Sequence, residues 1–166
     1  VHPSRSLAQQ AGMSYEAYRD FVYDAVLRDW ESLAEEMAQM KELLDAGSEV
    51  RIESGDDEIT MRIDGRTAVN SAASVAYDSH NLPSGEVFTA PYATEGSLTF
   101  DVPMTIQSRR VRDARLVFED GEVVDYSVET GEDALRDVLE TDEGARRLGE
   151  LGIGMNRGID RVTDNI

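Results

Sequence analysis

The chain has 166 residues, and its 34 Asp and Glu against 16 Lys and Arg give a formal net charge of −18. Nucleic-acid phosphates and anionic membrane surfaces would repel such a chain, which argues against both as partners. It has no cysteine, which excludes disulfides and thiolate metal sites. No apolar run is typical of a transmembrane helix or a signal peptide, so we expect a cytoplasmic protein of one domain, or one and part of another.

The basic residues are almost all arginine, since Lys41 is the only lysine. An acidic excess with so little lysine is typical of salt-loving archaea. In molar salt the Debye length falls to about 3 Å, so repulsion between like charges is screened. We therefore expect a halophilic protein.

Two helices are predicted in the first third of the chain. Ser14 precedes a run with apolar residues at helical spacing from Tyr15 to Val26, which predicts a helix capped by Ser14. A second helix is predicted from about Trp30 to Ala46, ended by Gly47. Its apolar residues, including its methionines, are expected in the core rather than on a binding surface: Leu33, Met37, Met40, Leu43 and Leu44.

Alternation of period two after Ser48 predicts antiparallel strands. Residues 49–54 and 58–64 form one predicted hairpin around the turn 54–57. Residues 97–104 form a further strand, in which Pro103 suggests an end or an edge. Residues 113–129 form the clearest hairpin, joined by the favoured turn pair Asp120-Gly121.

Thr130 is predicted to cap a helix over 131–140, with Asp133 completing an acidic variant of the capping box. Residues 142–156 are predicted to continue as a short helix before a glycine-rich segment around Ile153. Two N-terminal helices, an antiparallel hairpin-rich sheet and a returning helix together predict an α+β fold.

Common catalytic and nucleotide-binding motifs are absent. Gly149, Gly152 and Gly154 have the wrong spacing for a dinucleotide loop, and no strong strand precedes them. His80 is the one internal histidine. A Ser-His-Asp set around it and a metal site with Glu86 are the alternatives, but a solvated loop histidine is the favoured interpretation.

Four segments do resemble a known family: "AGMSYEAYRDFVYDA", "NLPSGEVFTAP", "TDEGARRLGELGIGMN" and the closing "TDNI". They are similar, in the same order, to the thermophilic metallo-aminopeptidases of the aminopeptidase T and aminopeptidase S group. The resemblance implies a dinuclear exopeptidase that removes N-terminal residues from peptides and forms homodimers. It also implies two domains, with residues 1–47 as the helical tail of the N-terminal domain and 48–166 as the first half of the C-terminal catalytic domain.

The resemblance assigns two carboxylates to a site for two divalent ions (Zn, Co, Mn or Mg). Glu86 matches the family's first metal-binding glutamate, and Glu150 matches the second. Glu143 is a rival for the second role, but its place at the start of a predicted helix already favours a carboxylate. Whether Glu150 is a metal ligand or the proton shuttle stays open.

Elementary chemistry makes the Glu86 assignment reasonable. Two divalent ions about 3.5–4 Å apart repel each other unless anions lie between them, and a Glu held by a tight Pro-Ser-Gly turn at the start of a strand is positioned in advance. The alternative is that Glu86 is a turn residue whose carboxylate caps nearby N–H groups.

The family's remaining ligands, two His, a Tyr and an Asp, have no counterparts in this sequence. The chain starts at Val1 and stops at the apolar Ile166, so we expect a piece of a longer protein that is inactive alone. Two other classes stay open: a non-enzymatic acidic association domain, and a carboxylate-based Ca²⁺ or Mg²⁺ binder, although no EF-hand spacing is present.

The charge generates a first prediction. We expect the thermal midpoint of unfolding to rise with KCl into the molar range, because salt screens the repulsion among 34 acidic residues. Thermal melts at low and high KCl check this; a midpoint that stays flat or falls would remove the argument for a halophilic protein.

Overall fold

The computed structural model describes residues 2–73 and 81–163. The chain divides into two compact units: Val1–Ala46, Thr67–Thr89 and Leu151–Ile166 form the first, and Gly47–Arg66 and Ala90–Glu150 form the second. Within the described residues, no helix has the length and apolar character needed to cross a membrane.

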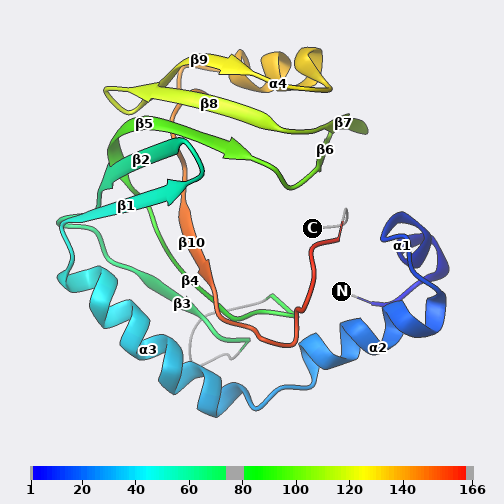
Figure 1. Cartoon of the computed structure of the whole chain (residues 1–166). Coiled ribbons are helices and arrows are strands. Elements are labelled where there is room, and N and C mark those ends of the chain that lie inside the picture. The colour runs from blue at the N-terminus through cyan, green and yellow to red at the C-terminus, as the bar shows by residue number, and fades with distance from the viewer. Residues whose placement is uncertain (1, 74–80, 164–166) are drawn as a thin grey trace. The chain divides into compact units, whose positions relative to one another are not determined.

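The first unit combines three helices with a small antiparallel sheet (Figure 1). The helices are α1 (Arg5–Gln10), α2 (Tyr15–Val26) and α3 (Trp30–Ala46). The sheet has the order β10–β4–β3, made of Leu151–Gly154, Glu86–Thr89 and Val69–Ser71. The helix α3 packs against β3 and β4.

Both predicted helices are confirmed. The Ser14 hydroxyl accepts a hydrogen bond from the Ala17 N–H at 3.1 Å and so caps α2. Tyr18 and Val22 are buried with Ala8 of α1 in one apolar cluster. Helix α1, which the sequence prediction missed, is therefore held by packing on α2.

The expected core face of α3 is only partly correct. Met37 and Leu44 are buried, as predicted, but the Leu43 side chain is 66% exposed. At 3.6 residues per turn, position 44 lies almost directly above position 37, whereas position 43 points about a third of a turn away. Adjacent leucines cannot both lie on the one narrow buried face.

The second unit is built on a five-stranded antiparallel sheet of order β1–β2–β5–β8–β9. These strands are Glu49–Ser54, Asp57–Arg62, Tyr92–Phe100, Ala114–Glu119 and Glu122–Ser127. A small hairpin of β6 (Met104–Ile106) and β7 (Arg109–Val111) and the helix α4 (Glu132–Leu139) complete the unit. The α+β prediction is confirmed; the predicted division at residue 47 concerns a longer protein and stays a prediction.

Both predicted hairpins form. β1 pairs with β2, and β8 pairs with β9 around Asp120 and Gly121, whose φ angles of 52° and 80° are those of a type I′ turn. Pro103 separates β5 from β6, in agreement with the predicted strand end.

The predicted start of the last helix is wrong in detail. Gly131, not Thr130, is the N-cap residue of α4; its φ is 87° and no side chain caps the helix. The Thr130 carbonyl instead accepts a hydrogen bond from the Arg112 N–H at 3.1 Å, because this stretch forms a β-bridge. Glu132 and Asp133 still place negative charge at the helix start.

The short helix predicted within 142–156 does not form. Residues 143–146 make a turn, and Arg147 makes a β-bridge to Glu122 at the start of β9. After Glu150 the chain enters the strand β10. The glycines of this segment disfavour a helix, and pairing with distant strands satisfies its backbone groups instead.

A charged and hydroxyl network joins three strands of the larger sheet. The Asp57 carboxylate accepts hydrogen bonds from Ser97 Oγ at 2.6 Å, Thr99 Oγ1 at 2.5 Å and Arg115 Nε at 2.9 Å. The hydroxyl of Ser97, then that of Thr99, then the Arg115 guanidinium lower the pKa of Asp57 to about 2. The sheet is thus cross-linked through an ionised carboxylate.

This network predicts a pH-dependent contribution to stability. The folded pKa of Asp57 lies below its ordinary value of 3.8, so the stabilisation is fully present above pH 3.8 and is lost as the pH falls through about 2. We expect Asp57→Asn to lower the melting temperature at pH 6, with the difference from wild type shrinking towards pH 2. Asp56→Asn, an exposed neighbour in the same turn, is the control; an equal effect of both variants would contradict the network.

Candidate metal centre

Glu86 is the first residue of β4, directly after the Pro83-Ser84-Gly85 turn. The turn is tied to β3 by two hydrogen bonds to the Ser71 carbonyl, from the Gly85 N–H at 2.8 Å and from Ser84 Oγ at 2.6 Å. The expectation that this turn leads into a strand at Glu86 is confirmed.

Gly85 fits its place only because it has no side chain. Its φ is 106°, and an added Cβ would lie 2.8 Å from the Cβ of Asn156. Its carbonyl accepts a hydrogen bond from the Met155 N–H at 2.7 Å. The chain after β10 therefore lies directly against the turn before Glu86.

Asn156 fixes that contact with its side chain. The side-chain amide Nδ2 donates to the Ser84 carbonyl and to the Ala25 carbonyl of α2, both at 2.9 Å. Its Oδ1 accepts from the Gly158 N–H at 3.0 Å, and the residue is only 8% exposed. A buried, fully engaged amide thus joins helix α2, the turn and the segment that follows β10.

The register of the small sheet shows which face Glu86 occupies. Asn70 donates its amide to the Ala34 carbonyl of α3 at 3.3 Å, and it pairs with Val87. Val87 is therefore on the α3 face, and Glu86, the preceding residue, points to the opposite face. Glu86 pairs there with Gly154 of β10.

Glycines leave room around the Glu86 carboxylate on that face. An added Cβ on Gly152 would lie 3.1 Å from Glu86 Oε2, while one on Gly154 would meet nothing within 4 Å. The alternating residues Leu151 and Ile153 pair with Thr89 and Val87, on the α3 side. Strand β10 therefore presents apolar residues to the core and bare backbone to the carboxylate.

The Glu86 side chain is half-buried, and among the described residues no hydrogen bond or ion pair to its carboxylate is found. The alternative interpretation, in which this carboxylate caps N–H groups of the turn, finds no such bond in residues 2–73 or 81–163. A half-buried carboxylate with unused oxygen lone pairs and open space beside it suits a cation ligand.

The other predicted residues are placed differently. Glu150 is exposed and directly precedes β10. Across the β4–β10 ladder, the residue opposite Glu86 is Gly154, so Glu150 is not its cross-strand partner. Glu143 is exposed and lies in a turn, so the helix start that was expected to explain its charge does not exist. His80 lies outside the described residues.

The described residues contain no group of three or more His, Asp or Glu side chains placed to hold a metal ion. Their donor set fits a metal site in part: Glu86 supplies hard carboxylate oxygens, but the further ligands of a complete site are not assembled in the described ranges. The sequence prediction named Glu86 but missed Gly152 and Asn156. The alternating glycines of "LGIG" could have predicted a strand with no side chains on one of its faces.

Comparison with known proteins relates this chain to a family of metalloproteases. Residues 1–166 match the family described as thermophilic metalloprotease (M29). The chain belongs to that family.

Its relatives include aminopeptidases. The chain is 43% identical to aminopeptidase T of Thermus aquaticus over 75 residues, which is 44% of this chain and 18% of the relative. It is 32% identical to aminopeptidase AmpS of Bacillus subtilis over 102 residues, 58% of this chain and 25% of the relative. The matched segments thus span about a quarter or less of these relatives' own length.

Solved structures share the fold. Wild-type AmpT from Thermus thermophilus matches with a TM-score of 0.75 and 27% identity, over 84% of this chain and 38% of AmpT. A 2,5-dihydroxypyridine dioxygenase from Pseudomonas putida KT2440 matches with a TM-score of 0.62 at 20% identity, over 80% of this chain and 41% of that one, which shows a similar fold alone.

The packing at Gly85 generates a prediction. We expect Gly85→Ala to lower the free energy of unfolding by about 1–3 kcal/mol, because a side chain there meets Asn156 and adopts a strained positive φ. Gly154→Ala, with open space and no positive φ, is the matched control and should be nearly neutral. Denaturant titrations of both variants measure the difference; equal stability of the two would contradict the close contact.

Proposed function

We propose that this chain contributes, within a protein of its relatives' length, the first part of the active site of a dinuclear metallo-aminopeptidase that removes N-terminal residues from peptides. The observation that carries the proposal is the half-buried Glu86 carboxylate without a partner among the described residues, on the glycine-lined face of the sheet. Membership of a metalloprotease family, and relatives named aminopeptidases, support it.

In this proposal Glu86 is a metal ligand held rigidly by its surroundings. Its backbone is fixed by pairing with Ser71 and Gly154 on both sides, and the turn before it is fixed by Asn156. A carboxylate positioned in advance binds a cation without first losing conformational freedom.

Glu150 is proposed as the second carboxylate, either as a ligand or as the group that moves the proton from water to the leaving amine. The exposed side chain is free to accept a proton at a carboxylate oxygen.

The two divalent ions, Zn, Co, Mn or Mg, when bound would polarise the peptide carbonyl and make water a better nucleophile. The remaining ligands would come from parts of the longer protein. We further propose a cytoplasmic, halophilic homodimer, with residues 1–47 ending an N-terminal domain and 48–166 beginning the catalytic domain. A Ca²⁺ or Mg²⁺ binder is the alternative that the acidic charge favours.

The proposal predicts the effects of substitutions that each remove one negative charge, tested in a protein of the relatives' length that contains this sequence. Glu86→Gln should lose bound metal and activity together, because an amide cannot offset the repulsion between two divalent ions. Glu150→Gln should lower the rate about 100-fold or more. The double variant should lose little beyond the worse single one, since the two groups act as a unit.

Bound metal per subunit and the rate on aminoacyl p-nitroanilides are measured side by side. Glu143→Gln, an exposed turn residue, is the control and should keep normal metal content and rate, and the 166-residue chain alone should show no turnover. Full metal with no rate in Glu150→Gln would make Glu150 the proton shuttle rather than a ligand. A fully active Glu86→Gln protein would defeat the proposal.

A further inference from the structure

Strand β10 forms one edge of the small sheet in the first unit, whose order is β10–β4–β3. Its register with β4 places Gly154 opposite Glu86. Both glycines of the strand, Gly152 and Gly154, are exposed. An edge strand keeps one row of main-chain N–H and C=O groups available to a further extended chain.

The hydrogen bonding at the end of β10 shows which residues supply that row. Met155 donates its N–H to the Gly85 carbonyl at 2.7 Å, and this pair continues the register between β10 and β4. In an antiparallel ladder, successive residues direct their main-chain groups to opposite neighbours. The odd-numbered residues of β10 therefore bond to β4, and Gly152 and Gly154 direct their N–H and C=O groups away from it.

These outward groups have no hydrogen-bond partner within residues 2–73 and 81–163, where β10 pairs with β4 alone. They belong to residues without side chains, so another backbone can approach them closely. The edge thus offers two N–H donors and two C=O acceptors, spaced for an extended chain.

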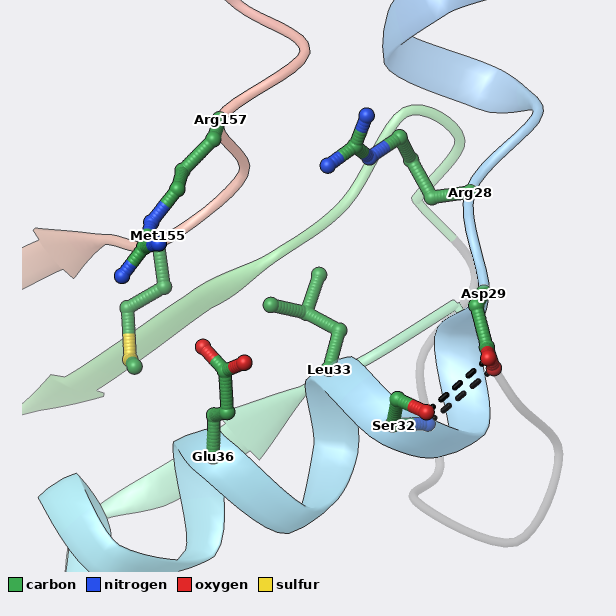
Figure 2. Close-up of a pocket in the computed structure, with 7 residues that line it drawn as sticks. All are labelled: Arg28, Asp29, Ser32, Leu33, Glu36, Met155 and Arg157. Carbon is green, nitrogen blue, oxygen red and sulfur yellow. Dashed lines mark hydrogen bonds between the residues drawn. The ribbon is translucent and has the colours of Figure 1, made fainter.

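Met155 also shows which face of β10 the glycines occupy. Figure 2 shows the Met155 side chain directed toward helix α3, which carries Leu33 and Glu36. Because side chains alternate along an extended chain, positions 152 and 154 face away from α3. That is the face of the Glu86 carboxylate.

The carboxylate itself lies over β10. An added Cβ on Gly152 would be 3.1 Å from Glu86 Oε2, although the residue opposite Glu86 is Gly154. The side chain of Glu86 therefore reaches from β4 across to the edge strand. A chain added to the free edge would lie about 4.8 Å from β10, so it would run beside any cation that this carboxylate holds.

We propose that the free edge of β10 binds the main chain of the peptide substrate as an added strand, with the N-terminal residue of the peptide at the ion site of Glu86. The inference rests on the proposed function and deepens it by naming the part of the peptide that is recognised. Gly152 and Gly154 exchange N–H···O=C hydrogen bonds with alternate residues of the peptide. Recognition through the main chain tolerates any side-chain sequence, which suits the removal of successive N-terminal residues.

A transient peptide fits this edge better than a permanent strand of the same protein. Pairs of side chains on neighbouring strands supply much of the stability of a sheet. On the Glu86 face, β10 has only Gly152 and Gly154 and so offers a neighbour no side chain to pack against. Pairing there consists of main-chain bonds alone, and the open face leaves room for ions and for the side chains of the peptide.

Kinetics with modified peptides test the pairing in a protein of the relatives' length that contains this sequence. The substrates are leucine followed by four alanines, with one N-methyl group at the third, fourth or fifth residue. Because main-chain groups alternate along a strand, methylation of the fourth residue should differ from methylation of the third and fifth. One of the two classes should raise KM about 10-fold, as expected for a lost hydrogen bond whose partner stays unpaired. Equal effects at all three positions, or none, would overturn the proposal.

A substitution removes one donor from the edge itself. Gly154→Pro eliminates an N–H that points away from β4, and proline is tolerated at such edge positions. It should lower kcat/KM for the unmethylated pentapeptide about 10-fold more than for leucine p-nitroanilide, which has no main chain beyond the scissile bond. Gly154→Ala keeps the N–H and is the matched variant, so its ratio of the two kcat/KM values should stay near that of wild type. Equal ratios in both variants would contradict pairing at this edge.

Amide hydrogen exchange in the metal-free protein examines the edge without catalysis. The Gly152 and Gly154 amides should exchange rapidly in the free protein and about 10-fold or more slowly with saturating pentapeptide, whereas the Ile153 amide, directed to β4, should be protected throughout. Protection of both glycines before peptide is added would show that another segment of the protein occupies the edge, and the proposal would be wrong.

The two proposals fail in different ways. A protein that hydrolyses leucine p-nitroanilide with bound metal, but whose glycine amides stay unprotected with the pentapeptide, contradicts the edge pairing alone. A protein without metal-dependent hydrolysis of leucine p-nitroanilide contradicts the proposed function, and the peptide-binding role of the edge as a substrate site falls with it.

Discussion

The first unit depends on one buried side chain, Asn156. Its amide donates to the Ala25 and Ser84 carbonyls at the same time, and its oxygen accepts from Gly158. Each of those buried carbonyls, left without a donor, would cost about 1–3 kcal/mol. Among the described residues no backbone hydrogen bond joins α2 to the turn at residues 83–85, so this amide fixes the turn to α2, while the bonds to the Ser71 carbonyl fix it to β3.

The two faces of the small sheet in the first unit differ: one packs against α3, and the other carries Glu86. On the α3 face, Val87 is fully buried and the Asn70 amide reaches the helix backbone. On the opposite face, Glu86 stands beside glycines, where a carboxylate keeps access to solvent and to a ligand. Because side chains alternate along a strand, a rigid anchor and an open site can occupy adjacent residues.

Local patterns predicted the parts of the fold that local forces determine. The helices at Tyr15–Val26 and Trp30–Ala46 and the hairpin around Asp120-Gly121 follow from spacing, capping and turn chemistry. A short helix was predicted within residues 142–156. Instead, backbone groups of this segment pair with β9 and β4, two strands that are distant in the sequence. Glu86 was identified from a resemblance and a turn; Gly152, which lies beside the Glu86 carboxylate, was not, because register between distant strands leaves no local signal.

Net charge and site geometry play different roles in this chain. A charge of −18 attracts cations everywhere, and molar salt screens that attraction within a few ångströms. Selective binding under such conditions has to come from short, directional contacts at fixed positions. In the proposed metal site, such contacts would come from Glu86, whose backbone is paired with strands on both sides. In molar salt the proposed role of Glu86 would therefore depend on the fixed position of its carboxylate rather than on the net charge of the chain.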